Sequence, residues 1–282
     1  DYFTQTYGRG RTPNPCVVCN QRIKFGWLAE AAQKLGASRI ATGHYARRGI
    51  SGSRYCLKKG MDPDKDQSYF LSMLSQKQLA WACFPLGEKT KAGVRQICRD
   101  HELVPVSGGE SQDICFIRNQ SYRSFVEARL EDPPHPGPIV DSRGNVVGRH
   151  DGLHRYTIGQ RRGINCPASA PYYVLRLDVK NNGLVVGFAD ELYCRYCEIA
   201  DVNWIAPMPN TPLRVQIQIR YRHQPVGGTI EPITATRAAL RFDRPESAVT
   251  PGQAAVCYID DEVVAAGWIE NHFMDNLHDD PS

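Results

Sequence analysis

The chain has 282 residues, of which 41% are hydrophobic and 23% are charged, and its mean hydropathy is -0.43. These values are typical of a globular protein with roughly two domains, and no apolar run is long enough to span a membrane. The net charge of +4 is compatible with a polyanionic partner but does not require one. No signal-peptide pattern opens the chain, so we expect a cytoplasmic protein whose ten cysteines are reduced, catalytic or metal-binding.

The N-terminal part of the chain alternates helical and strand patterns. Asn20 is a good N-cap, and Gly36 is a typical helix stop. Between them, apolar residues recur at helical spacing, at Ile23, Trp27, Ala31 and Leu35. A short strand pattern at residues 39–42 then leads into Gly43 and His44. This order is typical of a parallel α/β sheet, in which ligands bind beyond the carboxyl ends of the strands.

Local signals predict the elements that follow. Residues 45–48 and 54–58 flank a glycine-containing turn and predict a β-hairpin. Short helices are expected within residues 69–81, and Thr90 and Ser121 are predicted to cap two further helices.

The second half of the chain has a β pattern. A proline cluster at residues 133–138 marks the best domain boundary. Hairpins are predicted around the turns at residues 142–145 and 181–183. Strict alternation of apolar and polar residues at 214–222 indicates a strand with one buried face, as in an antiparallel barrel or sandwich.

Two thiols, Cys16 and Cys19, stand close together at the predicted start of the first helix. The thiolate is the reactive form of cysteine, and a helix N-terminus and nearby cations lower the pKa of a thiol. We expect Cys19 to have this advantage, because Arg22 and Lys24 follow it by one turn. A third thiol, Cys115, lies in a loop of similar character, and we expect the three to meet in space.

Paired cations recur along the chain. Any single pair is explained by a solvated surface, but recurrence beside the cysteine loops favours contacts with phosphate groups. The pairs are Arg9/Arg11, Arg22/Lys24, Arg47/Arg48, Lys58/Lys59, Arg161/Arg162 and Arg220/Arg222.

A Cys-x-x-Cys pair also has other interpretations. A zinc site would need a second pair, and Cys194 and Cys197 lie far along the chain in the β region, outside the usual ligand spacing. We expect these two to be unpaired residues of a strand or turn. A thiol–disulfide oxidoreductase that uses Cys16 and Cys19 is a third possibility, but it gives the long β region no purpose.

The segment at residues 107–113 imitates the Ser-Gly-Gly-x-Asp-Ser loop that holds pyrophosphate in ATP pyrophosphatases. Such a loop should join a buried strand to a helix N-terminus. Here an apolar run, residues 114–117, follows it. We therefore reject this segment as the ATP loop.

Several blocks of the sequence together resemble the tRNA-specific 2-thiouridylase family (MnmA/TrmU). They occur in the family's order, and their joint occurrence is very specific. The blocks are residues 10–20, 41–46, 65–71, 111–117, 157–163, 220–222 and 250–253. The resemblance implies part of an ATP-pyrophosphatase (Rossmann-like) α/β domain over residues 1–132, a small central β-rich domain over 133–197, and a C-terminal antiparallel β-barrel over 198–282.

The resemblance also implies roles for individual residues. Cys19 matches the catalytic nucleophile and Cys115 the cysteine that carries a persulfide. The segment that meets the target base matches Asn14, Pro15 and Cys16. Gly43 matches an ATP contact. The positions that touch tRNA match His44, Lys65, Asp66, Gln67, Arg220, Tyr221 and Gln253.

The implied reaction is ATP-dependent transfer of sulfur to C2 of the wobble uridine of tRNA. A uracil carbonyl is a poor electrophile, so the family adenylates the C2 oxygen and makes AMP the leaving group. The persulfide sulfur on Cys115 then attacks, Cys19 resolves the S–S bond, and a disulfide between the two cysteines remains. The base must be flipped out of its stack. The expected partners are tRNA and a sulfur-relay protein or cysteine desulfurase, with no membrane and a monomeric chain.

Two departures from the family keep alternatives open. The family's pyrophosphate loop belongs upstream of Asp1, so we expect a fragment that lacks most of the ATP site and that could be a non-catalytic tRNA-binding module. Many members have Asp where Cys16 stands. With this extra thiol, Cys16, Cys19 and Cys115 could instead hold an iron–sulfur cluster with an open iron position. We favour the persulfide route over the cluster.

Overall fold

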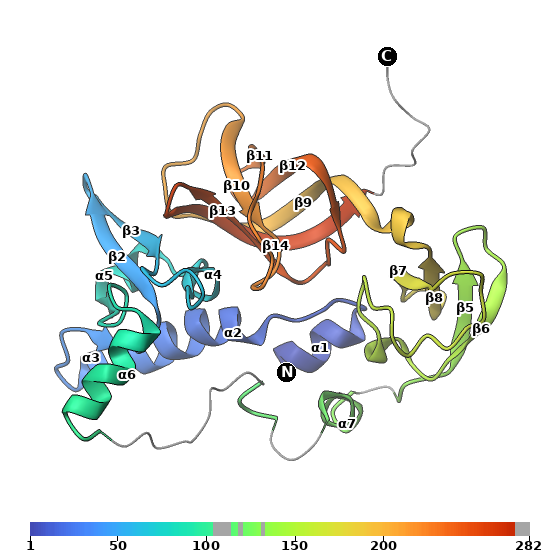
Figure 1. Ribbon diagram of the computed structural model, residues 1–282, viewed down its shortest axis with the longest axis horizontal. Helices are drawn as coiled ribbons and strands as arrows, with labels where there is room; N and C mark the ends of the chain where they lie inside the picture. Colours follow the sequence, from blue (N-terminus) through green and yellow to red (C-terminus); the bar gives the residue numbers. More distant parts are fainter. Residues whose placement is uncertain (104–113, 118–120, 131–132, 274–282) are drawn as a thin grey trace.

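The computed structural model describes residues 1–103, 114–117, 121–130 and 133–273, without the side chains of residues 271–273. The segment at residues 107–113, which was singled out in the sequence, lies outside this part. A C-terminal barrel lies between the α/β elements on one side and a smaller sheet on the other (Figure 1). Helices α1 (Tyr2–Gly8) and α2 (Pro15–Val18) run beneath the barrel from one side to the other.

The first long helix begins earlier than predicted. Asn14 is its N-cap, because the Asn14 side chain accepts a hydrogen bond from the backbone of Val17, and Pro15 follows at the first helical position. The helix continues from α2 through a π-helical stretch, η1 (Cys19–Trp27), into α3 (Leu28–Lys34). The predicted N-cap, Asn20, is therefore wrong, and this residue is buried inside the helix.

The π-helical stretch also changes which face is buried. The buried positions are Val17, Asn20, Phe25 and Ala29. The step of five residues from Asn20 to Phe25 follows from the wider i→i+5 winding of a π-helix. The residues that recur at regular α-helical spacing are largely turned outward: Ile23 is 54% exposed, Trp27 69% and Leu35 89%.

The remaining α/β elements confirm the local predictions. Strands β1 (Ile40–Ala41) and β4 (Ala82–Cys83) are parallel, and β2 (Ala46–Ser51) and β3 (Arg54–Lys59) form the predicted hairpin. Thr90 and Ser121 cap their helices through backbone N–H groups three residues on. The helices are α4 (Ser68–Leu71), α5 (Gln76–Trp81), α6 (Lys91–Asp100) and α7 (Tyr122–Glu127).

The C-terminal part is an antiparallel barrel, closed by the pairing of β13 with β14. Its interior is filled by alternate side chains such as Val215, Ile217 and Leu240. Cys194 and Cys197 point into this core from β9 and are buried strand residues, as predicted. The strands are β9 (Tyr193–Trp204), β10 (Leu213–Gln218), β11 (Val226–Thr234), β12 (Arg237–Ser247), β13 (Ala254–Ile259) and β14 (Glu262–Phe273).

The N-terminal hairpin is part of the barrel sheet, which the sequence did not indicate. Lys58 of β3 pairs with Glu262 of β14. Leu57 and Tyr69 share a core cluster with Tyr258 of the barrel. The α/β part and the barrel therefore share one hydrophobic core. The predicted domain limits stay a prediction, and the limit at 197/198 falls inside β9.

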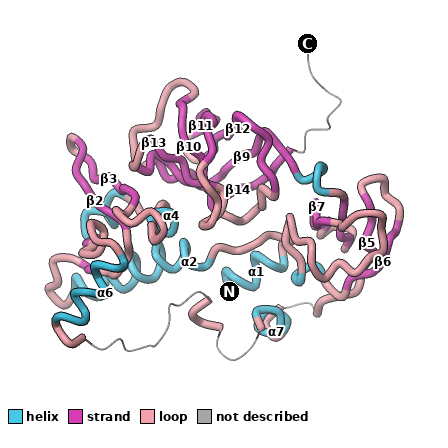
Figure 2. Tube along the Cα trace, in the orientation of Figure 1, coloured by secondary structure: helices cyan, strands magenta, loops and turns pink. Residues whose placement is uncertain are grey.

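The central part is a separate sheet with the order β6-β5-β8-β7. His150 ends β6, accepts a hydrogen bond at Nδ1 from Gly152 N and donates from Nε2 to Asn182 O, both at 3.0 Å. The strands are β5 (Gly137–Asp141), β6 (Val146–His150), β7 (Tyr173–Asp178) and β8 (Gly183–Gly187), with short 3-10 helices η2 (Leu153–Arg155) and η3 (Ala189–Leu192). Across the part of the chain that is described, no helix has the length and apolar character needed to cross a membrane. Figure 2 shows the helices, in cyan, mainly beside and beneath the strands of the barrel, in magenta.

Candidate active site

A cavity of about 1710 Å³ opens where the N-terminal helices, residues 114–117 and the turn after β10 meet. Its wall contains Cys16 and Cys19 from the first long helix and Cys115 from the distant segment. The structure thus brings together the three thiols that the sequence singled out.

Helix geometry gives Cys16 and Cys19 different positions. Cys16 is the second residue of α2, in the first turn, whereas Cys19 begins the π-helical stretch one turn later. The prediction that Cys19 stands at the helix N-terminus is therefore wrong, because the N-cap is Asn14. The thiol nearest the helix N-terminus is that of Cys16.

Asn14 is a junction between this helix and the barrel. Its backbone N–H donates to Tyr2 Oη at 3.2 Å, and its Nδ2 donates to Tyr69 Oη at 3.2 Å and to Gln253 Oε1 at 3.4 Å. Gln253 in turn donates to the carbonyls of Thr12 and Pro13 at 3.2 and 3.0 Å. Asn14 and Gln253 therefore hold the segment before the thiols against the barrel, and neither lines the cavity.

Cys115 lines the same cavity from a segment that is distant in sequence. The next residue, Phe116, packs edge-on against Phe3 with ring centroids 5.3 Å apart, and against Phe125 at 5.5 Å. Phe3 belongs to α1 and Phe125 to α7, and both line the cavity. Aromatic packing therefore sets the place of the Cys115 segment.

The three thiols interact electrostatically. Burial in the cavity wall raises the pKa of the Cys16 thiol, Cys115 and Cys19 raise it further, and Lys24 opposes the shift. Cys16 is nevertheless exposed to solvent, as an entering substrate base would require. All ten cysteines lie in the described residues and each is a free thiol, so the expected Cys19–Cys115 disulfide is not present.

No three His, Cys, Asp or Glu side chains in the described ranges are arranged to hold a metal ion. This holds for Cys16, Cys19 and Cys115, although they share one cavity. The arrangement does not support the iron–sulfur alternative.

Gly43 and His44 follow β1 and line the cavity, as a ligand site at the carboxyl end of a parallel strand should. His44 is buried, and its Nδ1 lies 2.8 Å from the Thr42 hydroxyl. Burial, helped by Lys24, lowers the pKa of His44 to about 4. His44 is therefore neutral at physiological pH and offers a hydrogen bond, not a charge.

The predicted tRNA positions 65–67 form one loop in the cavity wall. Asp66 accepts bonds from Gly60 N at 2.8 Å and from Ser68 N at 3.0 Å, and Gln67 accepts one from Tyr45 N at 3.0 Å. These two side chains order the loop, while Lys65 adds a cation to the wall.

The turn after β10 supplies the barrel's share of the wall. The ring of Tyr221 packs on that of Phe70 with centroids 4.2 Å apart, and both residues line the cavity. Arg220 is exposed, reaches the carbonyl of Ser247 at 3.4 Å and does not line the cavity.

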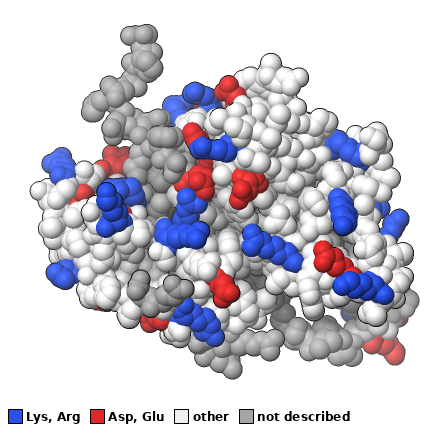
Figure 3. All heavy atoms as spheres, turned by 180° about the vertical axis from the view of Figure 1, so that it is seen from behind, with Lys and Arg blue, Asp and Glu red and all other residues white. Residues whose placement is uncertain are grey.

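Further cations in the wall were not assigned from the sequence. Three of the six cation pairs have one member in the cavity wall, namely Lys24, Lys59 and Arg222, and Lys91 and Arg129 join them. The pairs were visible in the sequence, but which member turns inward depends on packing. On the face seen in Figure 3, the described Lys and Arg side chains are interspersed with Asp and Glu. The cavity wall contains six Lys or Arg residues against Asp1, Asp64 and Asp66, so cations outnumber acids there, which suits phosphate groups.

Comparisons with known proteins agree with this arrangement. Three family models match in order: a tRNA methyl transferase HUP domain over residues 1–119, a tRNA methyl transferase PRC-barrel domain over 123–188, and an aminomethyltransferase β-barrel domain over 194–269. A tRNA-specific 2-thiouridylase MnmA from Desulfosudis oleivorans is 49% identical over 95% of this chain and 75% of its own length. The chain belongs to the tRNA-specific 2-thiouridylase family.

Other members support the same assignment. The 2-thiouridylases MnmA of Geotalea uraniireducens and Trichormus variabilis are 47% and 46% identical, each over 96% of this chain and over 72% and 78% of their own lengths. The methyl transferase wording of two family models names a different chemistry from that of these relatives. Membership of the 2-thiouridylase family implies tRNA as the substrate and ATP as the co-substrate, and confirms the predicted fold class.

Proposed function

We propose that this chain thiolates the wobble uridine of tRNA at C2, with Cys115 as the persulfide carrier and Cys19 as the nucleophile. The observation that supports it best is the meeting of Cys19 and Cys115, from distant parts of the sequence, in one cavity lined by cations. A flipped base and its phosphates can enter such a cavity, whereas a thiol buried in a core cannot react.

The proposed sulfur transfer has three steps. ATP adenylates the uridine C2 oxygen and releases pyrophosphate. The terminal sulfur of the Cys115 persulfide forms a bond to C2, and the C2–O bond to AMP breaks. The Cys19 thiolate then attacks Sγ of Cys115, and the electrons of the old S–S bond pass to the sulfur that stays on the base. A Cys19–Cys115 disulfide remains, which a dithiol reductant must open before the next cycle.

The other residues are proposed to bind the substrates. Gly43 leaves room for the nucleotide, and Pro15 and Cys16 meet the base. Asn14 holds this segment in place from behind. His44 contacts tRNA as a neutral group, while Lys65 and Tyr221 offer a cation and an aromatic face from the wall. We assign Asp66, Gln67 and Gln253 to shaping this tRNA surface, and Arg220 to a contact outside the cavity.

Serine variants of the thiols test this assignment. With tRNA, ATP and a persulfide donor, Cys19→Ser and Cys115→Ser should lower 2-thiouridine formation at least roughly 1,000-fold, because each removes a reacting sulfur. Mass spectrometry of the digested tRNA nucleosides measures the product. Cys98→Ser, on α6 outside the cavity wall, is the matched control. A Cys115→Ser variant that still thiolates tRNA would overturn the proposal.

Cys16→Ser separates the two sulfur routes. In the persulfide route the Cys16→Ser variant should retain activity within about tenfold of the unaltered protein, because Cys16 carries no reacting sulfur. Complete loss of activity, together with iron bound to anaerobically purified unaltered protein, would replace the persulfide route with a cluster. Binding of tRNA without thiolation by the unaltered chain would instead point to the non-catalytic module.

A further inference from the structure

The segment that carries Cys115 rests on α7. Phe116 packs against Phe125 of α7, and Phe125 lies 6.0 Å from Phe3 of α1. Tyr122 of α7 stacks on Tyr7 of α1 with ring centroids 5.6 Å apart. The position of Cys115 therefore depends on where α7 lies.

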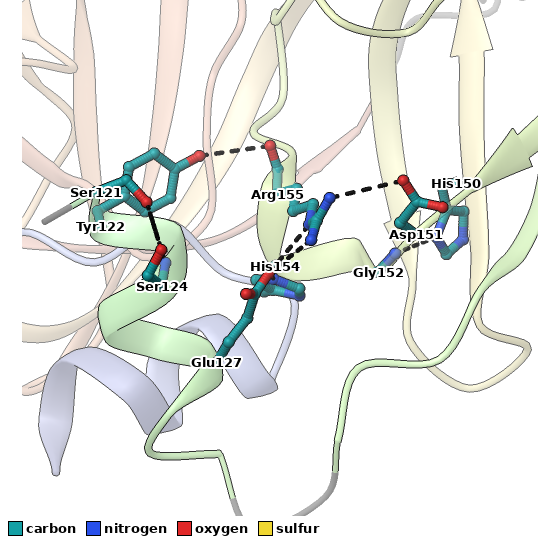
Figure 4. A network of polar contacts seen from close by, with 9 residues as sticks. All are labelled: Ser121, Tyr122, Ser124, Glu127, His150, Asp151, Gly152, His154 and Arg155. Carbon is teal, nitrogen blue, oxygen red and sulfur yellow. Dashed lines mark hydrogen bonds and ion pairs between the residues drawn. The ribbon is translucent and has the colours of Figure 1, made fainter.

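The other side of α7 is fixed to the central sheet through one carboxylate. Glu127 Oε1 accepts a hydrogen bond from His154 Nε2 at 2.9 Å, and from Arg155 Nε and Nη2 at 3.1 and 2.9 Å (Figure 4). Both partners belong to η2, next to the end of β6. Figure 4 shows Glu127 reaching from α7 toward η2, with Arg155 turned on its other side toward Asp151.

We call the contact of Glu127 with His154 and Arg155 the clamp. The charges of its three side chains favour a fixed geometry. His154 and then Arg155 hold the pKa of Glu127 below its usual range, so the carboxylate stays ionised. The His154 side chain is only 3% exposed, so its orientation is set by the fold. Tyr122 adds a bond from its hydroxyl to the Arg155 carbonyl at 3.4 Å. Several bonds to one oxygen from a fixed partner define the placement of α7 more closely than a single exposed ion pair would.

The clamp is needed because α7 is short. It spans Tyr122–Glu127 and has one fully buried side chain, Val126. Its place is therefore determined by the aromatic contacts on one side and by Glu127 on the other. The aromatic contacts connect α7 to the segment that carries Cys115, and the Glu127 carboxylate connects α7 to η2 beside the central sheet.

We propose that Glu127 is a positioning residue, which couples the central sheet to the active site and holds the Cys115 sulfur in the cavity that Cys19 also lines. This inference rests on the proposed function. It gives the central sheet a role in sulfur transfer, because displacement of η2 would move α7 and with it Cys115. A displacement near 1 Å is enough to slow a reaction between two positioned groups.

The test measures closure of the Cys19–Cys115 disulfide by a mild oxidant, in a Cys16→Ser background so that the bridged peptide is unambiguous. Glu127→Gln should slow closure roughly tenfold and lower kcat by a similar factor, with KM for tRNA and ATP nearly unchanged. Phe116→Ala should act in the same way, and Phe116→Leu should restore most of the rate because it refills the space beside Phe3 and Phe125.

The matched control is Asp243→Asn, which breaks a carboxylate–arginine pair with Arg214 on the barrel, away from the cavity. Closure in Glu127→Gln and Phe116→Ala at the rate of this control would overturn the inference and leave the proposed function standing. Absence of closure in the background protein itself would overturn both. Circular dichroism confirms that each variant is folded.

Discussion

At the scale of single residues, burial decides the chemistry of the titratable groups. Cys16 and His44 share the influence of Lys24, yet burial moves their pKa values in opposite directions, because it disfavours a thiolate in one and an imidazolium in the other. The cavity therefore holds a Cys16 thiol that loses its proton less readily than an ordinary thiol, and a neutral His44 imidazole, both near lysines. Neither property can be assigned from the residue type.

His44 predicts a pH dependence of stability. Its pKa is about 4 when folded and 6.5 when unfolded. Between these values the unfolded chain binds a proton that the folded chain does not, so stability present above pH 6.5 is lost as the pH falls. From pH 7 to pH 5 this amounts to roughly 2 kcal/mol.

Urea unfolding at the two pH values measures this loss. His44→Gln should lose about that share of the pH dependence, while a remainder stays with His150 and His223, whose pKa values burial also lowers. An unchanged pH dependence in the variant would contradict the assignment to His44.

At the scale of elements, tertiary contacts and not the local N-cap signal determine where the first long helix begins. Asn20 has the residue type of an N-cap, but Asn14 has the bonding partners. Because the Asn14 side chain caps α2 and also reaches Tyr69 and Gln253, it fixes the start of the helix relative to the barrel. Asn20 is instead drawn inside, where its Nδ2 donates to the Phe70 carbonyl at 3.1 Å.

Asn14→Ala should lower the free energy of unfolding by roughly 3 kcal/mol, because it removes a cap and leaves buried partners without a bond. Thr90→Ala on α6 is the control, since Thr90 caps its helix through Gly93 N alone and should cost roughly 1 kcal/mol. Denaturant titration compares the two. Equal losses would show that the barrel contacts of Asn14 contribute nothing.

At the scale of the whole molecule, the barrel supplies part of the active-site wall and shares its sheet and core with the α/β part. The hairpin β2–β3 joins its sheet, and ion pairs fasten the two parts: Arg54 to Glu262 at 2.5 Å and Arg47 to Asp261 at 2.7 Å. Since the core cluster is also shared, we expect the α/β part and the barrel to unfold together.

A double-mutant cycle on Arg54→Met and Glu262→Gln should give a coupling of about 1 kcal/mol, because both side chains are partly buried. The same cycle on the more exposed pair Arg214 and Asp243 should give a smaller coupling. If the coupling at Arg54 is no larger than at this control pair, the ion pair does not fasten the hairpin to the barrel.

The sequence by itself determined those features whose causes lie between near neighbours. The caps at Thr90 and Ser121 and the start of β10 depend on residues a few positions apart, so they were predictable, although β10 ends at Gln218 and not at residue 222 as the alternation predicted. The motif blocks likewise indicated the family and its thiols before any contact was known.

Tertiary structure alone decided the π-helical winding, which cation pairs reach the cavity, and the contact between Glu127 and η2. Each of these features depends on contacts between segments that are distant in sequence. The π-helical winding brings Phe25 into the core. The clamp joins α7 to η2, two elements that no local sequence pattern connects. Packing between distant segments determines such features, and a local sequence pattern does not encode it.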